Sequence, residues 1–362
     1  MSDDWRIAFA GALAFVIVTA LVPFCRRFAL ARGITDGPAQ GKLHRTPTPY
    51  LGGVAIAVAA AGSSIVLPDL PREAVVVLAA ACVVSVAGLV DDIRGLRAAT
   101  RLAIEIPAAG AAVAAGARVH LFGTGADFVI SVLFLVVLTN AFNLLDNMDG
   151  VAGAMGTTIA IALATTALIE HQMLVGGLAV VVAATCLGFL VYNWHPAEIF
   201  MGDAGSLFLG FLLAIIALKL RTGVSHSASA LALILLMGPA LFDTALVVIS
   251  RTRARRPIYI GGTDHTSHRL VLLGLSPVSA AVFLVVATAL SAALGVLVAE
   301  GAVAAGIMAP VVAVGAILGL AFMLRVGAYE SAPGRGELAR ADRSLVSSKA
   351  IVRGKFAVTR RR

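Results

Sequence analysis

The chain alternates between long apolar segments and short polar ones. The apolar segments span approximately residues 7–25, 51–68, 74–90, 102–119, 128–145, 151–169, 174–192, 205–220, 228–249, 276–298 and 303–324. None of them alternates with the period of two that marks a half-buried strand. A helix needs about 20 apolar residues to cross a bilayer, where it satisfies its own backbone hydrogen bonds. The pattern therefore predicts an all-α, polytopic membrane protein with about 11 transmembrane helices.

Composition excludes a soluble globular domain. Hydrophobic residues make up 59% of the 362 residues and charged residues 13%, whereas a soluble domain carries about 25% charged residues. Gly and Ala are abundant in the apolar segments, which suits close packing of helices in a bilayer. Cys25, Cys82 and Cys186 lie far apart, so we interpret them as packing residues and not as a disulfide framework or a metal site.

The Lys and Arg residues orient the chain. If the N-terminus lies outside and the segments alternate, 23 of the 28 Lys and Arg residues fall on the inner side. Because cytoplasmic loops carry the excess of positive charge, we expect an external N-terminus and a cytoplasmic C-terminus. The chain starts acidic and no small-residue cleavage site follows the first apolar segment, which indicates a retained span.

The predicted domain organisation is simple. Residues 1–324 form one integral membrane domain, and residues 325–362 form a basic cytoplasmic tail, rich in Ser, Gly and Arg, that we expect to be mostly disordered. The net charge of +8 suits nucleic acid or anionic lipid. The charges lie in short loops and in the tail, with no basic stripe interleaved with aromatic residues. We therefore expect contact with membrane lipid and not with nucleic acid.

The predicted topology brings five unusual polar segments to the cytoplasmic face. They are residues 41–53, 88–101, 140–150, 193–206 and 261–270. The predicted outer loops hold nothing comparable. Polar segments that come from distant parts of the chain and meet on one face predict a single site. That site would face the cytoplasm, where nucleotide-activated substrates are found.

Asp91 and Asp92 adjoin at the end of the third apolar segment. Adjacent carboxylates repel each other and are costly at a membrane boundary. A divalent cation or a cationic group of a substrate would offset that cost. The alternative is a solvated helix end, but near-membrane carboxylates are functional by default.

A second acidic segment follows the fifth apolar segment. Polar residues recur there every three positions and at helical spacing form one stripe: Asn140, Asn143, Asp146 and Asp149. Such side chains bind ribose hydroxyls, a base edge or a metal-bound water. A helix C-terminus with Asn147 and Gly150 as its cap is the alternative explanation.

Residues 200–206, Phe-Met-Gly-Asp-Ala-Gly-Ser, hold one acid between two glycines just before an apolar segment. Glycines let backbone N–H groups approach an anion, and a helix N-terminus binds phosphate. Asp203 would ligate Mg²⁺ beside that phosphate. The alternative is an ordinary Asp or Ser N-cap.

The last polar segment contains Asp264, His265, His268 and Arg269. Two histidines and an arginine suit recognition of pyrophosphate or a sugar, and the alternative is a solvated basic loop. A zinc site would need further ligands, which this segment lacks.

The first polar segment is a weaker signal. It holds Lys42 and His44 before two prolines that stiffen the start of the second apolar segment. Two further acids, Glu105 and Asp243, lie inside predicted spans, and we assign them a structural or supporting place without a definite role.

Together the five segments resemble the polyprenyl-phosphate N-acetylhexosamine-1-phosphate transferases, which make the first lipid-linked sugar of cell-wall and surface polysaccharides. The matches run from residue 42 to residue 270 in the family's order. The resemblance implies that a UDP-N-acetylhexosamine and a polyprenyl phosphate give polyprenyl-diphosphate-sugar and UMP. It also implies Mg²⁺, or Mn²⁺ in its place, and a location in the cell (inner or plasma) membrane.

The resemblance also implies roles for individual residues. Asp91 and Asp92 match the family's paired acids, and Asp203 matches its metal-binding aspartate, with Asp92 helping to hold the metal. Asp91 would act as a base, as a nucleophile or only as an orienting group. His265 and His268 match the histidines of the last catalytic loop. The residues expected to bind substrate are Lys42, His44, Asn140, Asn143, Asp146, Asp149, Phe200, Arg101 and Arg269, with Phe200 stacked on uracil.

This sequence departs from the family's usual pattern in several places. Arg101 and Glu105 stand where the family usually has Lys and Gln, and the planar fork of Arg is not equivalent to an ammonium group. Asn147 stands where many members have Gly. The histidine loop, His-Thr-Ser-His-Arg, resembles the branch that transfers N-acetylglucosamine phosphate. Transfer of phospho-N-acetylmuramoyl-pentapeptide in peptidoglycan synthesis is the alternative.

Rival classes fit the sequence less well. An ion-coupled transporter places acids near the bilayer midplane and has internal repeats, whereas these acids cluster at one face. A CDP-alcohol phosphatidyltransferase has Asp-Gly followed closely by Ala-Arg, but here Val-Ala-Gly follows Gly150. The sequence leaves open the sugar, the prenyl chain length and the oligomeric state, for which a homodimer is one option.

Overall fold

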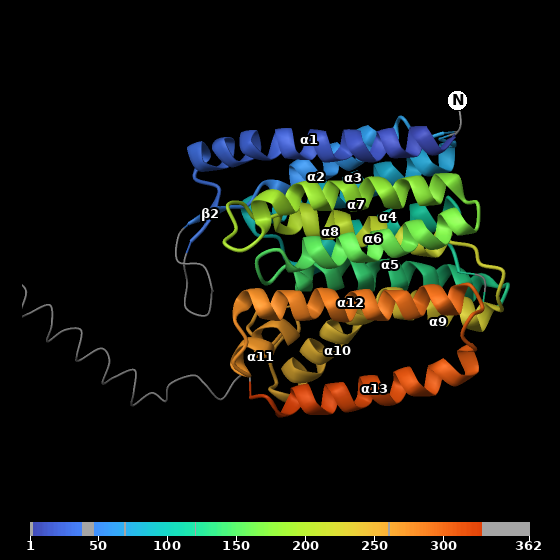
Figure 1. Ribbon diagram of the computed structural model, residues 1–362. Coiled ribbons are helices and arrows are strands. Elements are labelled where there is room, and N and C mark those ends of the chain that lie inside the picture. The colour runs from blue at the N-terminus through green and yellow to red at the C-terminus, as the bar shows by residue number, and fades with distance from the viewer. Residues whose placement is uncertain (1–2, 38–46, 69, 120, 260, 328–362) are drawn as a thin grey trace, which may run out of the picture. The chain divides into compact units, whose positions relative to one another are not determined.

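The computed structural model describes residues 3–37, 47–68, 70–119, 121–259 and 261–327. The helices are α1 (Asp3–Arg32), α2 (Gly52–Ser64), α3 (Arg72–Arg94), α4 (Ala98–Ala114), α5 (Gly125–Leu145), α6 (Val151–Ile169), α7 (Met173–Asn193), α8 (Gly202–Lys219), α9 (His226–Leu236), α10 (Gly238–Arg253), α11 (Thr266–Leu272), α12 (Pro277–Ala299) and α13 (Ala305–Arg325). Two short strands, β1 (Thr35–Asp36) and β2 (Thr48–Pro49), pair antiparallel. The mostly helical fold that the apolar pattern predicts is confirmed (Figure 1).

Each predicted apolar segment contains a helix, but not every helix is long enough to span a bilayer. Within the described residues, eight helices are long and apolar enough, or nine if the bent pair α9 and α10 is one span. The α2 and α4 helices have 13 and 17 residues, which is roughly 20 and 25 Å at 1.5 Å per residue against a hydrocarbon core of about 30 Å. The chain is therefore a multi-pass membrane protein, and the count of 11 is not confirmed.

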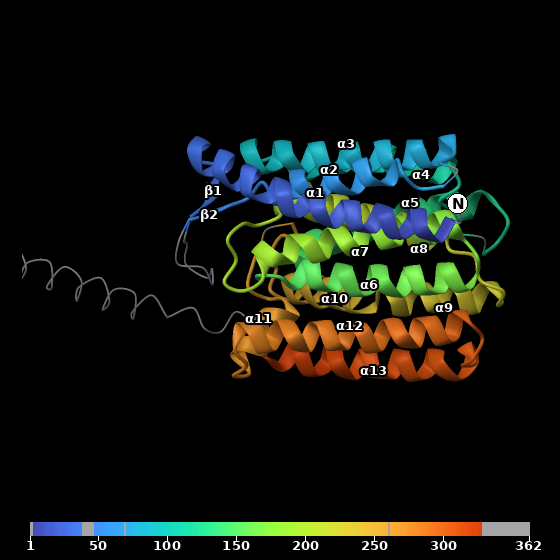
Figure 2. The same ribbon diagram turned by 45° about the horizontal axis from the view of Figure 1, so that its top comes forward.

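The α8 helix forms the centre of the helical bundle. Every residue from Ala204 to Leu218 is buried, and α8 packs against α2, α3 and α5. In α13, by contrast, only Met323 is buried. Figures 1 and 2 agree that α1–α3 and α12–α13 lie on opposite sides of the bundle. A polar group at the start of α8 is thus surrounded by helices on several sides.

The helix ends that carry the predicted site gather at one end of the bundle. The chain enters α1 at the other end, and β2 and α11 lie at the end opposite to that start (Figure 1). This arrangement agrees with the alternation assumed for the sequence, whereas the orientation in a membrane stays a prediction. Lys42, His44 and nearly all of the predicted tail lie outside the described residues.

Candidate active site

The acid pair ends α3, and Asp92 is bound to the start of α8. Its Oδ1 and Oδ2 accept hydrogen bonds from the backbone N–H groups of Asp203 and Ala204, at 2.9 and 3.1 Å. Because α8 has no side-chain cap from its own N-cap residue, Asp92 satisfies two N–H groups that the first turn leaves open. Gly202 permits this contact: its φ is +65°, and a Cβ there would lie 2.6 Å from Asp92 Oδ2.

Arg101, in the first turn of α4, connects two of the acids. Its Nη1 lies 3.0 Å from Asp91 Oδ2 and 2.9 Å from Asp203 Oδ2. The other oxygen of Asp91 accepts the backbone N–H of Leu96. The side chains of Asp91 and Arg101 are only 11% and 18% exposed, so salt screens this ion pair less than a surface pair. The structure therefore brings Asp91, Arg101 and Asp203 together, as expected.

The α5 helix supplies two asparagines to different partners. Asn143 Nδ2 donates to Asp203 Oδ1 at 2.7 Å and to Ser206 Oγ at 3.0 Å. One turn earlier, Asn140 Nδ2 donates to Glu105 Oε2 at 2.5 Å. Asn143 thus fixes the orientation of the Asp203 carboxylate. Asn140, expected to bind substrate, instead bonds to Glu105, which is 1% exposed.

The predicted polar stripe is interrupted where α5 ends. Asp146 is the C-cap residue of α5, and Gly150, with φ of +72°, is the N-cap residue of α6. Only Asn140 and Asn143 therefore keep helical spacing, and Asp146 and Asp149 lie in the turn that follows. The alternative explanation is correct in that α5 ends here, but its C-cap is Asp146, and Gly150 caps the start of α6 and not the end of α5.

Asp146 lies within reach of the other acids. Burial raises the pKa of its carboxyl to about 8, and the negative charges of Asp203, Asp92 and Asp149 add to that rise. A cation near Asp146 would relieve this repulsion. Among the described residues, no three His, Cys, Asp or Glu side chains form a ready metal site. The assignment of Asp203 and Asp92 as metal ligands stays a prediction.

Two residues in the segment 193–206 support the turn, and sequence reasoning assigned them no role. Asn193 Oδ1 accepts the Gly150 N–H at 3.2 Å, and its Nδ2 donates to Ile199 O at 2.9 Å. His195 Nδ1 lies 2.8 Å from Asp149 Oδ2. The sequence feature that could have indicated them is two polar side chains between the end of an apolar segment and Pro196.

The backbone of Phe200 connects this segment to α2. Its N–H donates to Pro49 O at 2.8 Å, and its C=O accepts the Gly52 N–H at 3.0 Å. The α2 and α8 helices cross closely beside it, since a Cβ on Gly53 would lie 2.1 Å from Gly205 N. Phe200 is therefore held at the start of α8, and its stacking on uracil stays a prediction.

The two predicted histidines lie at the start of α11, His265 as its N-cap residue and His268 in its first turn. His265 is 3% exposed, with its Nδ1 2.9 Å from Asp243 Oδ2. Arg269 is 2% exposed and donates to Asp264 O and Met323 O at 3.0 and 2.7 Å. Both side chains thus bind groups inside the protein, in contrast to the phosphate contacts expected of them.

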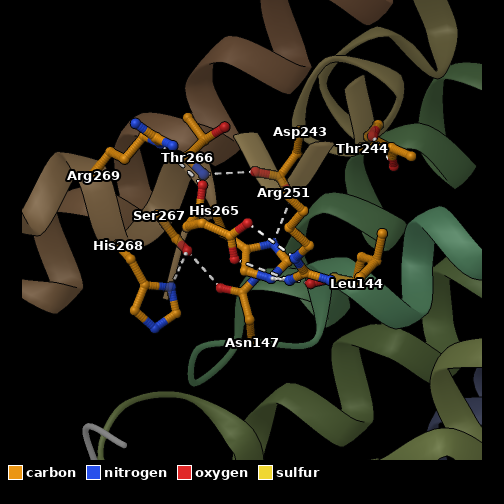
Figure 3. Close-up of polar contacts among 12 residues, drawn as sticks. Leu144, Asn147, Asp243, Thr244, Arg251, His265, Thr266, Ser267, His268 and Arg269 are labelled. Carbon is orange, nitrogen blue, oxygen red and sulfur yellow. Dashed lines mark hydrogen bonds and ion pairs between the residues drawn. The ribbon is translucent and has the colours of Figure 1, made fainter. Parts of the chain in front are cut away.

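His268 points toward the side of α11 that faces Asn147 (Figure 3). Its Nδ1 lies 3.2 Å from Ser267 Oγ, which in turn donates to Asn147 Oδ1. Burial lowers the pKa of His268 to about 4, and the neighbouring His265 adds to the fall. His268 is therefore neutral at pH 7 and lies beside the acidic turn after α5.

The arrangement suits a reaction of anionic phosphates. Four carboxyl groups lie close together at the ends of three helices: Asp91, Asp92, Asp146 and Asp203. Arg101 contacts two of them, Asp91 and Asp203. Such a surplus of negative charge attracts a divalent cation, which can then hold a phosphate. The cluster lies at the end of a membrane-spanning bundle, where a lipid and a water-soluble substrate can meet.

Comparison with known proteins agrees with this chemistry. A sequence profile of glycosyl transferase family 4 matches residues 74–221. That range contains the paired acids, the asparagines of α5 and Asp203, but not α11.

Similar proteins extend the match over most of the chain. The chain is 33% identical over 75% of its length to the "Probable undecaprenyl-phosphate N-acetylglucosaminyl 1-phosphate transferase" of Bacillus subtilis, covering 79% of it. It is 32% identical over 75% of its length to decaprenyl-phosphate N-acetylglucosaminephosphotransferase of Mycobacterium tuberculosis, covering 77%. It is 30% identical over 71% of its length to phospho-N-acetylmuramoyl-pentapeptide-transferase of Desulforamulus reducens, covering 85%. With this coverage of the relatives and with the acids in the profile-matched range, the chain belongs to glycosyl transferase family 4.

Proposed function

We propose that the protein transfers N-acetylglucosamine 1-phosphate from UDP-N-acetylglucosamine to polyprenyl phosphate and releases UMP, as the first membrane step of a cell-envelope polysaccharide. The observation that carries the proposal is the meeting of Asp91, Arg101 and Asn143 around Asp203. The names of two relatives that share this region describe the same transfer. The UDP-sugar is made in the cytoplasm, so we infer a plasma-membrane protein whose site faces that compartment.

Mg²⁺ fits the donors of this site, and Mn²⁺ would fit the same oxygens. Carboxylates are the ligands that Mg²⁺ prefers. The pKa of Asp146 is raised by burial and, in addition, by the negative charges of Asp203, Asp92 and Asp149. Asp203 and Asp146 would hold the metal. When bound, the metal neutralises the diphosphate and the UMP leaving group. Asp92 would act indirectly, because both of its oxygens accept N–H groups of α8 and so fix Asp203.

The protein's own residues would position the two phosphates for an in-line displacement. In phosphoryl transfer, catalysis is mainly positioning and neutralisation of charge. Within the described part of the chain, Arg101 is the cation that contacts Asp91 and Asp203, and it would move from them to the oxygens of a phosphate. Asp91 would then face the phosphate of the lipid and orient it. That phosphate is largely dianionic at neutral pH, so only a minor fraction needs a base.

The nucleotide would bind on the side of the turn after α5. Asp149 is fixed there by His195 and by the Ala197 N–H at 3.1 Å. Phe200 is fixed by its backbone and offers a ring for stacking on uracil. His268 is neutral, so it would act as a hydrogen-bond donor or acceptor and not as a cation.

The experiment offers two donors to purified protein with Mg²⁺ and polyprenyl phosphate, with UMP release as the readout. Lipid-dependent UMP release from UDP-N-acetylglucosamine alone supports the proposal. Release from the UDP-muramoyl-pentapeptide alone would keep the reaction and replace the substrate, as the similarity to the pentapeptide transferase allows. No release from either donor by folded protein would leave a transporter or another donor as the explanation.

A further inference from the structure

Asp243 has no place in the transfer chemistry described above, although it is a buried acid. It is 2% exposed and lies in α10, which meets α9 at a bend of 71°. Its Oδ1 accepts the backbone N–H of Thr266 at 2.6 Å, and its Oδ2 lies 2.9 Å from His265 Nδ1. Asp243 therefore binds both the first N–H group of α11 and the side chain of the residue that precedes it.

The partners of His265 fix the orientation of its ring. A carboxylate oxygen only accepts hydrogen bonds, so His265 Nδ1 carries the hydrogen. Its Nε2 lies 3.5 Å from Nη2 of Arg251, which only donates. His265 thus directs its Nδ1–H at Asp243, and its two nitrogens both face protein groups. This arrangement leaves no ring nitrogen for a substrate.

Arg251 fixes the other side of the same segment. Its Nε and Nη2 lie 3.0 Å from Oδ2 and Oδ1 of Asp264, and its Nη1 donates to Ile258 O at 2.7 Å. Arg251 is 2% exposed and Asp264 is fully buried. A paired, two-point contact of this kind is rigid as well as strong. We call Asp243, Arg251, Asp264 and His265 the α11 clamp.

The clamp is connected to the nucleotide side through the next residue of α11. Ser267 Oγ donates to Asn147 Oδ1, and Asn147 Nδ2 donates to Leu144 O at 2.7 Å. Asn147 lies in the turn between Asp146 and Asp149. Figure 3 shows the sequence of contacts from Asp243 through Thr266 and Ser267 to Asn147. A shift of α11 would therefore move the turn that carries these acids.

We propose that Asp243 and Arg251 are positioning residues of the transferase, which lock His265 and α11 so that Ser267 holds the Asp146–Asp149 turn in its nucleotide-binding form. His265 is then a positioning residue as well, and His268 is the histidine of α11 that reaches the substrate. The inference rests on the proposed function, because it assigns that turn to the nucleotide.

The first test is the affinity for UMP, measured by calorimetry on full-length protein in detergent. Asp243→Asn keeps the size of the side chain but directs an N–H group at His265 Nδ1, which forces the other tautomer toward Arg251. We expect affinity for UMP to fall about tenfold or more, as it does when a supporting partner of a site is lost. The KM for polyprenyl phosphate should stay unchanged.

Asp127→Asn is the matched control. Asp127 is also 1% exposed and accepts three backbone N–H groups, but at the start of α5, away from the acids. It should lower thermal stability without changing affinity for UMP. Equal affinity in Asp243→Asn and the wild type would overturn the inference. Absence of UMP binding by the wild type would instead refute the proposed function.

Rescue at His265 separates positioning from chemistry. An Asn side chain reproduces the Nδ1–H of histidine, whereas Gln reproduces Nε2. His265→Asn should therefore keep activity within a few-fold of the wild type, and His265→Gln should lose about tenfold or more. In addition, Ser267→Ala should cost much less in Asp243→Asn than in the wild type, since both act through one connection. If His265→Asn is inactive, or if the effects of Ser267→Ala and Asp243→Asn are additive, the positioning role of the α11 clamp is contradicted.

Discussion

Around Arg101, Asp91 and Asp203 share one cation, and Asp92 and Asp146 place two further carboxyl groups close by. In the α11 clamp, by contrast, each acid has its own base: Asp243 lies beside His265, and Asp264 beside Arg251. The first region has one contacting cation for several carboxyl groups, and we propose that a metal and phosphates bind there. The second is buried, and both of its acids are satisfied by contacts within the protein, so it adds rigidity and not binding capacity. A surplus of charge therefore separates the chemical part of the site from its support.

The largest effect is expected at Asp203. Asp203→Asn keeps the size and shape of the side chain but removes the charge that binds Arg101 and that, in our proposal, holds the metal. We expect the rate of UMP release to fall about 10²- to 10³-fold, as when a group that stabilises transition-state charge is lost. A steady-state assay at saturating Mg²⁺ measures it. A rate within threefold of the wild type would mean that the surplus of charge is not catalytic.

Arg101 tests whether charge or shape matters in the acid region. One atom, Nη1, makes both of its contacts with Asp91 and Asp203, so a Lys ammonium can replace it. We expect Arg101→Gln to lose activity on the order of 10²-fold and Arg101→Lys to lose roughly threefold. Equal losses in both variants, measured as kcat/KM for the UDP-sugar, would show that the guanidinium itself is required.

Glu105 lies one turn further along α4 than Arg101 and adds an acid to this region. Its Oε2 accepts from Asn140, which a Gln can also do, so Glu105→Gln removes charge and keeps the contact. The Mg²⁺ concentration that gives half-maximal activity should rise about two- to fivefold, because a nearby negative charge is lost. Titration of activity with Mg²⁺ measures this. If this concentration is unchanged or lower, the charge of Glu105 does not strengthen binding of the metal.

The smallest effect concerns pH and His268. Because burial lowers the pKa of His268 to about 4, this side chain stays neutral from pH 5.5 to 8. The ratio of kcat/KM between the wild type and His268→Gln should then vary by no more than about twofold over that range. An ordinary histidine, with a pKa of about 6.5, would be mostly protonated at pH 5.5. A ratio that falls or rises steeply below pH 6.5 would show that His268 titrates.

The apolar pattern was sufficient to predict the helices, and the polar segments between them were sufficient to predict which acids meet. Asp91 and Asp203 meet because the helix ends that carry them lie at one end of the bundle, which alternation of spans already requires. The number of spans was harder, since α2 and α4 are short and the segment 228–249 is divided by the bend between α9 and α10.

Side-chain partners could not be read from the sequence. Arg269 and His265 resemble phosphate ligands by residue type. In the fold they are buried, and Arg269 donates to Met323 O while His265 contacts Asp243. Asp92 stands beside Asp91 in sequence, but successive residues of a helix point about 100° apart, and Asp92 reaches the start of α8 instead of Arg101. These outcomes depend on packing between distant helices, which local spacing does not determine.

The central claim is transfer of a sugar phosphate and not of the sugar alone. The most direct measurement uses UDP-N-acetylglucosamine labelled with ³²P in the β-phosphate, together with polyprenyl phosphate and Mg²⁺. We expect the label to enter the lipid fraction and the released nucleotide to be unlabelled UMP, and we expect Asp203→Asn to abolish both. Label that leaves as UDP, with an unlabelled glycolipid, would contradict the account, because the bond broken would then be the one between the sugar and the β-phosphate.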